Sequence, residues 1–228
     1  MDGDVEPRRP ATTSIALAIT GASGAIYAMR TLAALLARRV HVELIVSDYG
    51  RRLLHDELGD AASVDRLVDF LTEKYGESVR AGSVRVHSNR DLGATIASGS
   101  HGCAGMAIVP CSMKTLAAIA HGLSRKLIER AADVMLKEAR RLVVVPRETP
   151  MSLPQLRNMV LCAEAGAMIL PAMPAFYQQP RTLDDLADFM AGKILGALGF
   201  EHDLYPPWTG RVPGREPGSV PGKVPGTV

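Results

Sequence analysis

The chain has 228 residues, of which 47% are hydrophobic and 22% are charged, and its formal net charge is +2. This composition is typical of a globular protein with one sizeable core. The sequence has no basic stripe of the kind that indicates nucleic-acid binding. No apolar run approaches the roughly 18 residues of a membrane span, and the first ten residues lack the apolar centre of a signal peptide.

The cysteines and histidines form no known metal-binding spacing. The three cysteines, Cys103, Cys111 and Cys162, include no CxxC pair, and the six histidines include no HExxH motif. We therefore expect no metal site. A sparse, odd set of cysteines predicts buried, reduced thiols in a cytoplasmic protein.

The two ends of the chain differ from its middle. Residues 1–13 are predicted to be a disordered leader. Residues 211–226 repeat RVPG, REPG, SVPG and KVPG, and a proline in every four residues prevents helix formation. We therefore predict one domain over residues 14–208 and a disordered tail over residues 209–228.

The domain is predicted to open with a buried strand over residues 14–19, the turn TGASGA over residues 20–25, and a helix over residues 26–39. This order is typical of anion binding, because glycines let the backbone approach a phosphate and the helix start offers free N–H groups. Ser23 adds a hydroxyl, although such turns also occur without a ligand. A nicotinamide enzyme is disfavoured, because the GxGxxG fingerprint is absent and no tyrosine has a lysine four residues on.

A second strand is predicted over residues 40–46 and ends at Ser47. Helices over residues 51–58 and 63–75 follow, and the first carries Glu57, for which a solvated helix face is the plainest interpretation. A short strand is predicted over residues 84–87. Residues 91–105, DLGATIASGSHGCAG, are too long and polar for a tight turn, and we predict a loop able to pack over a ligand.

Two polar turns follow buried strands in the second half of the chain. The strands are predicted over residues 107–110 and 142–146, and the turns CSMKT and RET follow them at residues 111–115 and 147–149. Ligands bind beyond the carboxyl ends of the strands in a doubly wound sheet, so these turns are predicted to form the floor of a binding site. Ser112 lies at the expected N-cap of a helix, and capping alone would also account for it.

The remaining elements complete the sheet and its covering layers. Helices are predicted over residues 126–141, 152–164 and 182–198, and capping boxes open the last two. A last short strand is predicted over residues 167–170. Five or six strands that alternate with helices predict an α/β fold, a three-layer α/β/α sandwich with a doubly wound, Rossmann-like, mostly parallel sheet.

Five motifs, in this order and spacing, resemble one known family. TGASGA, VPCSMKTLA, LIERAADVMLKE, VPRETP and PAFYQQP resemble the UbiX-type flavin prenyltransferases, and the resemblance covers residues 15–208. It implies an enzyme that joins a dimethylallyl group from dimethylallyl monophosphate to N5 and C6 of reduced FMN without a metal. It also implies a homododecamer with FMN at subunit contacts, and delivery of prenylated FMN to a UbiD-type decarboxylase.

The resemblance also implies a role for individual residues. The FMN-binding residues would be Gly21, Ala22, Ser23, Ser47, Ser112, Met113, Lys114, Thr115 and Arg147. The site for dimethylallyl phosphate would consist of Arg130, Lys137, Glu148, Tyr177, Lys193 and Trp208. The residues implied in catalysis are Ser23, Glu57, Glu148 and Lys137.

These residue types suit the implied chemistry. Allyl transfer separates a phosphate from a delocalised cation, so cations and hydrogen-bond donors must hold the leaving phosphate, and an aromatic face stabilises the allylic cation. Ring closure at C6 needs a base, for which Glu57, Glu148 and the released phosphate are candidates. Two positions depart from the family pattern: Leu92 stands where members often carry an aromatic residue, and Lys193 where some carry arginine.

Two other functions stay open for this fold. The flavin-dependent cysteine decarboxylases carry a PxSANT-like motif and an early catalytic histidine. Here residues 110–115 read PCSMKT, and neither His55 nor His87 has the matching context. The second is a non-catalytic protein that stores or carries FMN, but such a protein would not need the cations that the resemblance assigns to the phosphate.

Overall fold

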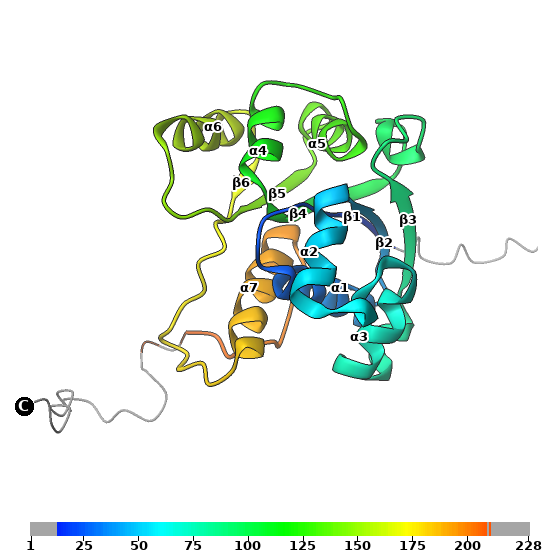
Figure 1. Ribbon diagram of the computed structural model, residues 1–228, viewed down its shortest axis with the longest axis vertical. Coiled ribbons are helices and arrows are strands. Elements are labelled where there is room, and N and C mark those ends of the chain that lie inside the picture. Colours follow the sequence, from blue (N-terminus) through cyan, green and yellow to red (C-terminus); the bar gives the residue numbers. More distant parts are fainter. Residues whose placement is uncertain (1–12, 209, 211–228) are drawn as a thin grey trace, which may run out of the picture.

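The computed structural model describes residues 13–208 and residue 210 (Figure 1). The rest of the predicted leader and tail lies outside the described residues. The described residues form one sheet of six parallel strands in the order β3-β2-β1-β4-β5-β6. The strands are β1 (Ser14–Ile19), β2 (His41–Val46), β3 (Ser83–Ser88), β4 (Cys103–Cys111), β5 (Arg141–Pro146) and β6 (Met168–Ile169).

Helices cover both faces of the sheet, as Figure 1 shows. One layer holds α1 (Ala25–Ala37), α2 (Asp48–Leu58), α3 (Leu67–Tyr75) and α7 (Leu183–Leu198), and the other holds α4 (Met113–Ala120), α5 (Leu127–Lys137) and α6 (Leu153–Glu164). Side chains of a strand alternate between its faces, so Leu17 of β1 packs into the first layer and Ala18 into the second. The predicted three-layer, doubly wound sandwich is confirmed.

Several predicted boundaries differ from the structure. The helix predicted over residues 126–141 spans only Leu127–Lys137, because the chain turns at residues 138–140 and Arg141 already begins β5. The helix predicted over residues 63–75 begins only at Leu67, after 3₁₀ turns over residues 60–62 and 64–66. Helix α2 begins three residues early, because the Ser47 hydroxyl accepts a hydrogen bond from Gly50 N and caps it at Asp48. The loop predicted to end at residue 105 ends before Cys103, because backbone pairing with β1 already begins β4 at that residue.

The strand order places a crevice between β1 and β4. From β1 the chain continues to β2 on one side, and β4 lies on the other side. A parallel sheet binds ligands at such a reversal, beyond the carboxyl ends of the strands. The Thr20 hydroxyl joins the two ends, because it donates to Pro110 O at 2.8 Å and accepts from Ser112 N at 2.7 Å.

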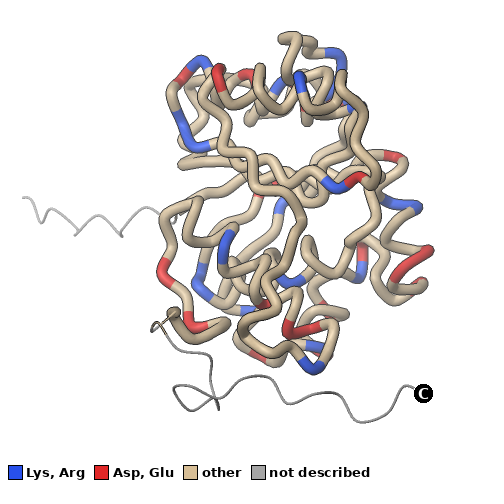
Figure 2. Tube along the Cα trace, turned by 90° about the vertical axis from the view of Figure 1, so that its left-hand side faces the viewer, with Lys and Arg blue, Asp and Glu red and all other residues tan. Residues whose placement is uncertain are grey.

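Basic and acidic residues are interspersed over both helical layers (Figure 2). Among residues 13–208, no helix has the length and apolar character needed to cross a membrane.

Candidate active site

A cavity of about 300 Å³ lies at the carboxyl edge of the sheet. This volume is at the lower end of the range for small-molecule sites. Five residues that the sequence assigned to flavin binding line it: Gly21, Ser47, Ser112, Lys114 and Thr115. The turns after β1, β2 and β4 therefore meet as predicted, because the carboxyl ends of parallel strands share one edge.

The start of α4 gives the cavity its hydrogen-bond donors. The Ser112 hydroxyl accepts from Thr115 N at 3.4 Å and lies 3.1 Å from the Thr115 hydroxyl, so Ser112 is an N-cap as predicted. The first N–H groups of a helix have no partner within the helix, so those of Met113 and Lys114 are available to a ligand. With the Lys114 ammonium beside them, they make this helix start suitable for a phosphate.

Two glycines let the turns around the cavity pack closely. A Cβ atom on Gly21 would lie 2.4 Å from the Tyr49 Cβ, and one on Gly50 would lie 2.5 Å from Ile19 O. Neither space admits a side chain. The turn after β1 and the start of α2 can therefore touch only because both positions are glycine.

The start of α1 already holds an anion, which comes from the chain itself. The Glu57 carboxylate accepts hydrogen bonds from Gly24 N at 3.0 Å and from Ala25 N at 2.8 Å. The anion-binding character predicted for the glycine-rich turn is therefore present, but Glu57 occupies these N–H groups. Glu57 is exposed, but its carboxylate is hydrogen-bonded to the chain and does not simply face solvent. Because Glu57 occupies the N–H groups at the start of α1, the start of α4 is the better candidate for binding a phosphate.

Arg147 joins the turn after β5 to the turn after β1. Its Nε donates to Ser23 O at 3.0 Å. Tyr27 lies beside this contact: burial raises the pKa of its phenol, the Arg147 charge lowers that pKa and the Glu57 charge raises it. Next to Arg147, Glu148 accepts a hydrogen bond from Thr149 N at 3.0 Å. The predicted residues Ala22, Ser23, Glu57, Arg147 and Glu148 therefore all lie at or beside the turns that end β1 and β5.

The residues predicted to bind dimethylallyl phosphate fall into separate groups. Arg130 and Lys137 lie on α5, where Arg130 pairs with Asp133 at 2.6 Å and Lys137 with Glu138 at 2.6 Å. Their heads are partly exposed, and within residues 13–208 each pairs with a carboxylate on α5 or directly after it. These two cations lie in the layer that α4, α5 and α6 form.

An aromatic group lies in the opposite layer. The rings of Tyr177 and Trp208 are 5.0 Å apart, and the Lys193 Nζ lies 5.6 Å from the centre of the Phe189 ring on α7. Helices α5 and α7 cover opposite faces of the sheet (Figure 1). Within a single chain, the sheet therefore separates the aromatic side chains from Arg130 and Lys137. Leu92 lies apart from the cavity lining, 47% exposed in the loop after β3.

The sequence missed half of the cavity lining: Asp48, Tyr49, Asn89, Lys126 and Glu129. Asp48 and Tyr49 directly follow Ser47, and Asn89 directly follows β3. Because ligands of a parallel sheet bind beyond the carboxyl ends of its strands, the positions of these three residues alone could have identified them. Asn89 also anchors α5, because its backbone and side-chain oxygens accept from Leu127 N and Ile128 N. Within residues 13–208, no three His, Cys, Asp or Glu side chains are placed to hold a metal ion.

By sequence and by structure, this chain is similar to flavoproteins. Residues 5–194 match the Flavoprotein family. The flavin prenyltransferase UbiX of Alkalihalophilus pseudofirmus is 45% identical over 191 residues, 83% of this chain and 93% of that protein. The crystal structure of AnUbiX (PadA1) in complex with FMN and dimethylallyl pyrophosphate has a TM-score of 0.74 at 38% identity, over 86% of this chain and 99% of that chain.

Two further structures are informative. A dodecameric FMN-dependent UbiX-like decarboxylase from Escherichia coli O157:H7 has a TM-score of 0.76 at 36% identity, over 86% of this chain and 99% of that chain. A PPC decarboxylase has a TM-score of 0.50 at 16% identity, over 72% of this chain and 84% of that chain. The second likeness shows a common fold and nothing more.

Proposed function

The chain belongs to the Flavoprotein family and, within it, to the UbiX flavin prenyltransferases, and from this premise we propose that it transfers a dimethylallyl group to reduced FMN. One observation carries the proposal for this chain: the cavity at the carboxyl edge has the N–H groups, hydroxyls and ammonium of the α4 start on its wall. This donor set suits the phosphate of a flavin mononucleotide.

FMN is a substrate here, and several groups are placed to hold it. Ser112, Met113, Lys114 and Thr115 bind its phosphate from the α4 start. Gly21, Ala22, Ser23 and Ser47 line the approach of the flavin, and Arg147 adds a cation, which its bond to Ser23 O holds in place. The close packing at Gly21 supports this assignment, because glycine lets the turn after β1 lie directly against Tyr49 in the cavity wall.

The donor in this proposal is dimethylallyl monophosphate. Arg130 and Lys137 bind its phosphate, and both present exposed cationic heads on α5. Tyr177 and Lys193 complete the phosphate site, and the Trp208 ring faces the allyl group. The AnUbiX structure contains the pyrophosphate, so the monophosphate and the pyrophosphate are both to be tested as donors.

The proposed reaction requires groups that stabilise the leaving phosphate and groups that transfer protons. The allylic C–O bond breaks as the flavin N5–C bond forms and N5 loses its proton to the leaving phosphate, so cations must stabilise the negative charge of that phosphate. Ring closure then adds a proton to the alkene and removes one from C6, so a base is needed. Both oxygens of Glu57 face Gly24 N, whereas Glu148 has one backbone partner. We assign proton transfer to Glu148 with Ser23, and positioning of the first turn to Glu57.

A complete site in this proposal needs a second subunit. Arg130 and Tyr177 belong to layers on opposite faces of one sheet, so the donor site closes only when another copy supplies one half. Apolar side chains are exposed where such a copy would pack: Leu153, Leu156 and Val160 on α6, with exposed fractions of 58%, 45% and 55%. We propose a homo-oligomer, and specifically a dodecamer, because the UbiX-like relative from Escherichia coli O157:H7 is dodecameric.

The remaining features of the proposal concern the setting of the reaction. Transfer proceeds without a metal, and the product serves a UbiD-type decarboxylase. The protein works in the cytoplasm, which the three buried, free cysteines support, because thiols stay reduced there.

The proposal is tested by supplying the purified protein with reduced FMN and the donor and weighing the flavin that it releases. A carrier returns FMN unchanged. A cysteine decarboxylase also returns FMN unchanged, and it releases carbon dioxide from cysteine-containing substrates.

A further inference from the structure

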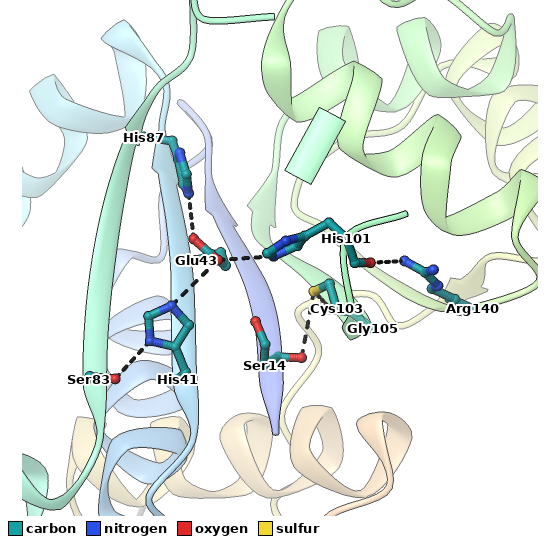
Figure 3. Close-up of polar contacts among 9 residues, drawn as sticks. All are labelled: Ser14, His41, Glu43, Ser83, His87, His101, Cys103, Gly105 and Arg140. Atoms are coloured by element: carbon teal, nitrogen blue, oxygen red, sulfur yellow. Dashed lines mark hydrogen bonds and ion pairs between the residues drawn. The ribbon is translucent and has the colours of Figure 1, made fainter. Parts of the chain in front are cut away.

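A buried carboxylate lies among three histidines in the sheet, on residues that the proposed reaction does not use (Figure 3). Glu43 is the third residue of β2 and is only 2% exposed. His87 Nε2 lies 2.5 Å from its Oε2, and His101 Nε2 lies 3.1 Å from its Oε1. His41 Nε2 is more distant, at 3.5 Å.

Such a carboxylate needs these partners. An isolated buried charge costs several kcal/mol, and N–H donors offset that cost only when they are held at hydrogen-bond distance. All three imidazoles face the carboxylate oxygens (Figure 3). The cluster therefore ties together the elements that supply the histidines.

His101 is the member that lies outside the sheet strands. It belongs to the segment of residues 97–101, which leads into β4 and which α5 covers. Arg140 donates to His101 O at 2.7 Å and to Gly99 O at 2.6 Å, and Arg130 Nε donates to Ala97 O at 3.1 Å. The segment is therefore held by Glu43 on one side and contacts a proposed donor-binding cation on the other.

Lys137 lies against the same segment. A Cβ atom on Gly99 would be 2.1 Å from Glu138 Oε1 and 3.0 Å from Lys137 Nζ, so the Gly99 backbone touches this ion pair. Segment 97–101 thus contacts both α5 cations. A displacement of the segment would change the direction in which both heads point.

We propose that Glu43 is a positioning residue for the prenyl donor: through His101 it fixes segment 97–101, and the segment fixes Arg130 and Lys137. This inference rests on the proposed function, which gives those cations the donor phosphate. Arginine binds phosphate through a planar fork of N–H groups, so its affinity depends on orientation, and Ala97 O sets that orientation by holding Nε. A misplacement of about 1 Å far from the chemistry can cost about 100-fold.

The cluster contains its own matched control. His41 faces the same carboxylate, but its Nδ1 lies 2.8 Å from the Ser83 hydroxyl on β3 and it touches no part of segment 97–101. His41→Ala and His101→Ala therefore each remove one histidine partner of Glu43. Only His101→Ala removes the contact between Glu43 and the segment, which Arg140 and Arg130 continue to hold on its other side.

The test titrates dimethylallyl monophosphate into full-length protein loaded with oxidised FMN, which binds the donor without transfer. We expect His101→Ala and Glu43→Gln to weaken donor binding about tenfold while FMN affinity stays unchanged. His41→Ala should bind the donor as wild type does, and His101→Gln, which keeps an N–H donor, should recover most of the affinity. With reduced FMN, His101→Ala should raise KM for the donor more than it lowers kcat.

Amide hydrogen exchange independently measures whether His101 holds segment 97–101 in place. Residues 97–101 should exchange faster in His101→Ala than in His41→Ala. Equal losses of donor affinity in the two histidine variants, or unchanged donor affinity in His101→Ala, would overturn the inference while leaving the proposed function intact. Wild-type protein that binds the donor but forms no product would overturn the function alone. Wild-type protein that binds no donor would overturn both.

Discussion

The Glu57 carboxylate on α2 accepts a 2.8 Å hydrogen bond from the backbone N–H of Ala25, the first residue of α1. It also accepts from Gly24 N, so one side chain satisfies two of the free donors at this helix start. No side chain at the N-cap does so, because that position is Gly24. The conformation of the turn that carries Ser23 therefore depends on a residue of another helix.

This contact gives a prediction for two variants of Glu57. Glu57→Ala should lower the free energy of unfolding by about 1 kcal/mol, the usual effect of losing a helix cap, and should weaken FMN binding because the first turn loosens. Glu57→Gln keeps an acceptor oxygen and should recover most of both. Urea unfolding and flavin fluorescence titration measure the two effects. FMN affinity equally low in both variants would show that the negative charge, and not the cap, is what matters.

The second prediction concerns the close approach of Gly21 to Tyr49. Gly21→Ala should weaken FMN binding strongly, because the new Cβ would lie 2.4 Å from the Tyr49 Cβ and force the turns around the cavity apart. Gly196→Ala is the matched control, because a Cβ there meets nothing within 4 Å and the position is helical. The control should be neutral or stabilising by up to about 1 kcal/mol. A Gly21→Ala protein with wild-type FMN affinity would remove this turn from the flavin site.

Much of the cavity could be predicted because it depends on strand ends. Ser47, Ser112 and Arg147 each follow a buried apolar run, and parallel strands bring such positions to one edge whatever the details of packing. Local patterns likewise predicted the capping box at Ser152 and the cap at Thr182. For example, Thr182 N donates to the Asp185 carboxylate at 2.9 Å, as the capping pattern predicts.

The remainder depends on contacts between distant residues, which no local pattern encodes. Glu57 lies 33 positions from Gly24, and His101 lies 58 positions from Glu43. The apolar run of β2 predicted a strand but gave no reason for a charge within it. The sequence also grouped Arg130 with Tyr177, although which face of the sheet a helix covers is decided by the crossover that leads to it.

The third prediction follows from this division of the donor site. Lys137→Ala and Lys193→Ala should each lower prenyl transfer about 100-fold or more, because each removes a cation that we propose to stabilise the leaving phosphate. Mixed oligomers that contain both variants should recover part of the activity, because some interfaces combine an intact α5 with an intact α7. Doubly tagged, co-expressed protein is the material to assay. Mixed oligomers as inactive as their parents would place the complete site within one chain.

The fourth prediction concerns the stability of the Glu43 cluster as the pH changes. Burial alone would raise the pKa of Glu43, but the hydrogen bond from His87 and the charges of His87, His41 and His101 outweigh it and lower the pKa below 4.5. Arg85 stands in register with Glu43 on the neighbouring strand β3. A carboxyl with a lowered folded pKa adds stability that is present above its unfolded pKa and is lost as the pH falls through the folded pKa.

Glu43→Gln should therefore be less stable than wild type by about 2 kcal/mol at neutral pH. The difference should shrink well below pH 4.5, because a protonated Glu43 resembles glutamine. Urea unfolding at a series of pH values measures it, with Asp69→Asn as a control that removes an exposed pair with Arg80. A difference between Glu43→Gln and wild type that does not change with pH would mean that Glu43 is not ionised in the folded chain.

The central claim is that this protein makes a prenylated flavin, and the mass of the flavin it releases tests that claim most directly. The protein is incubated without oxygen with reduced FMN and dimethylallyl monophosphate, then denatured, and the flavin is weighed. We predict a species heavier than FMN by one five-carbon prenyl unit, formed without added metal and lost in Lys137→Ala. Recovery of FMN alone, with both the monophosphate and the pyrophosphate as donors, would contradict the account.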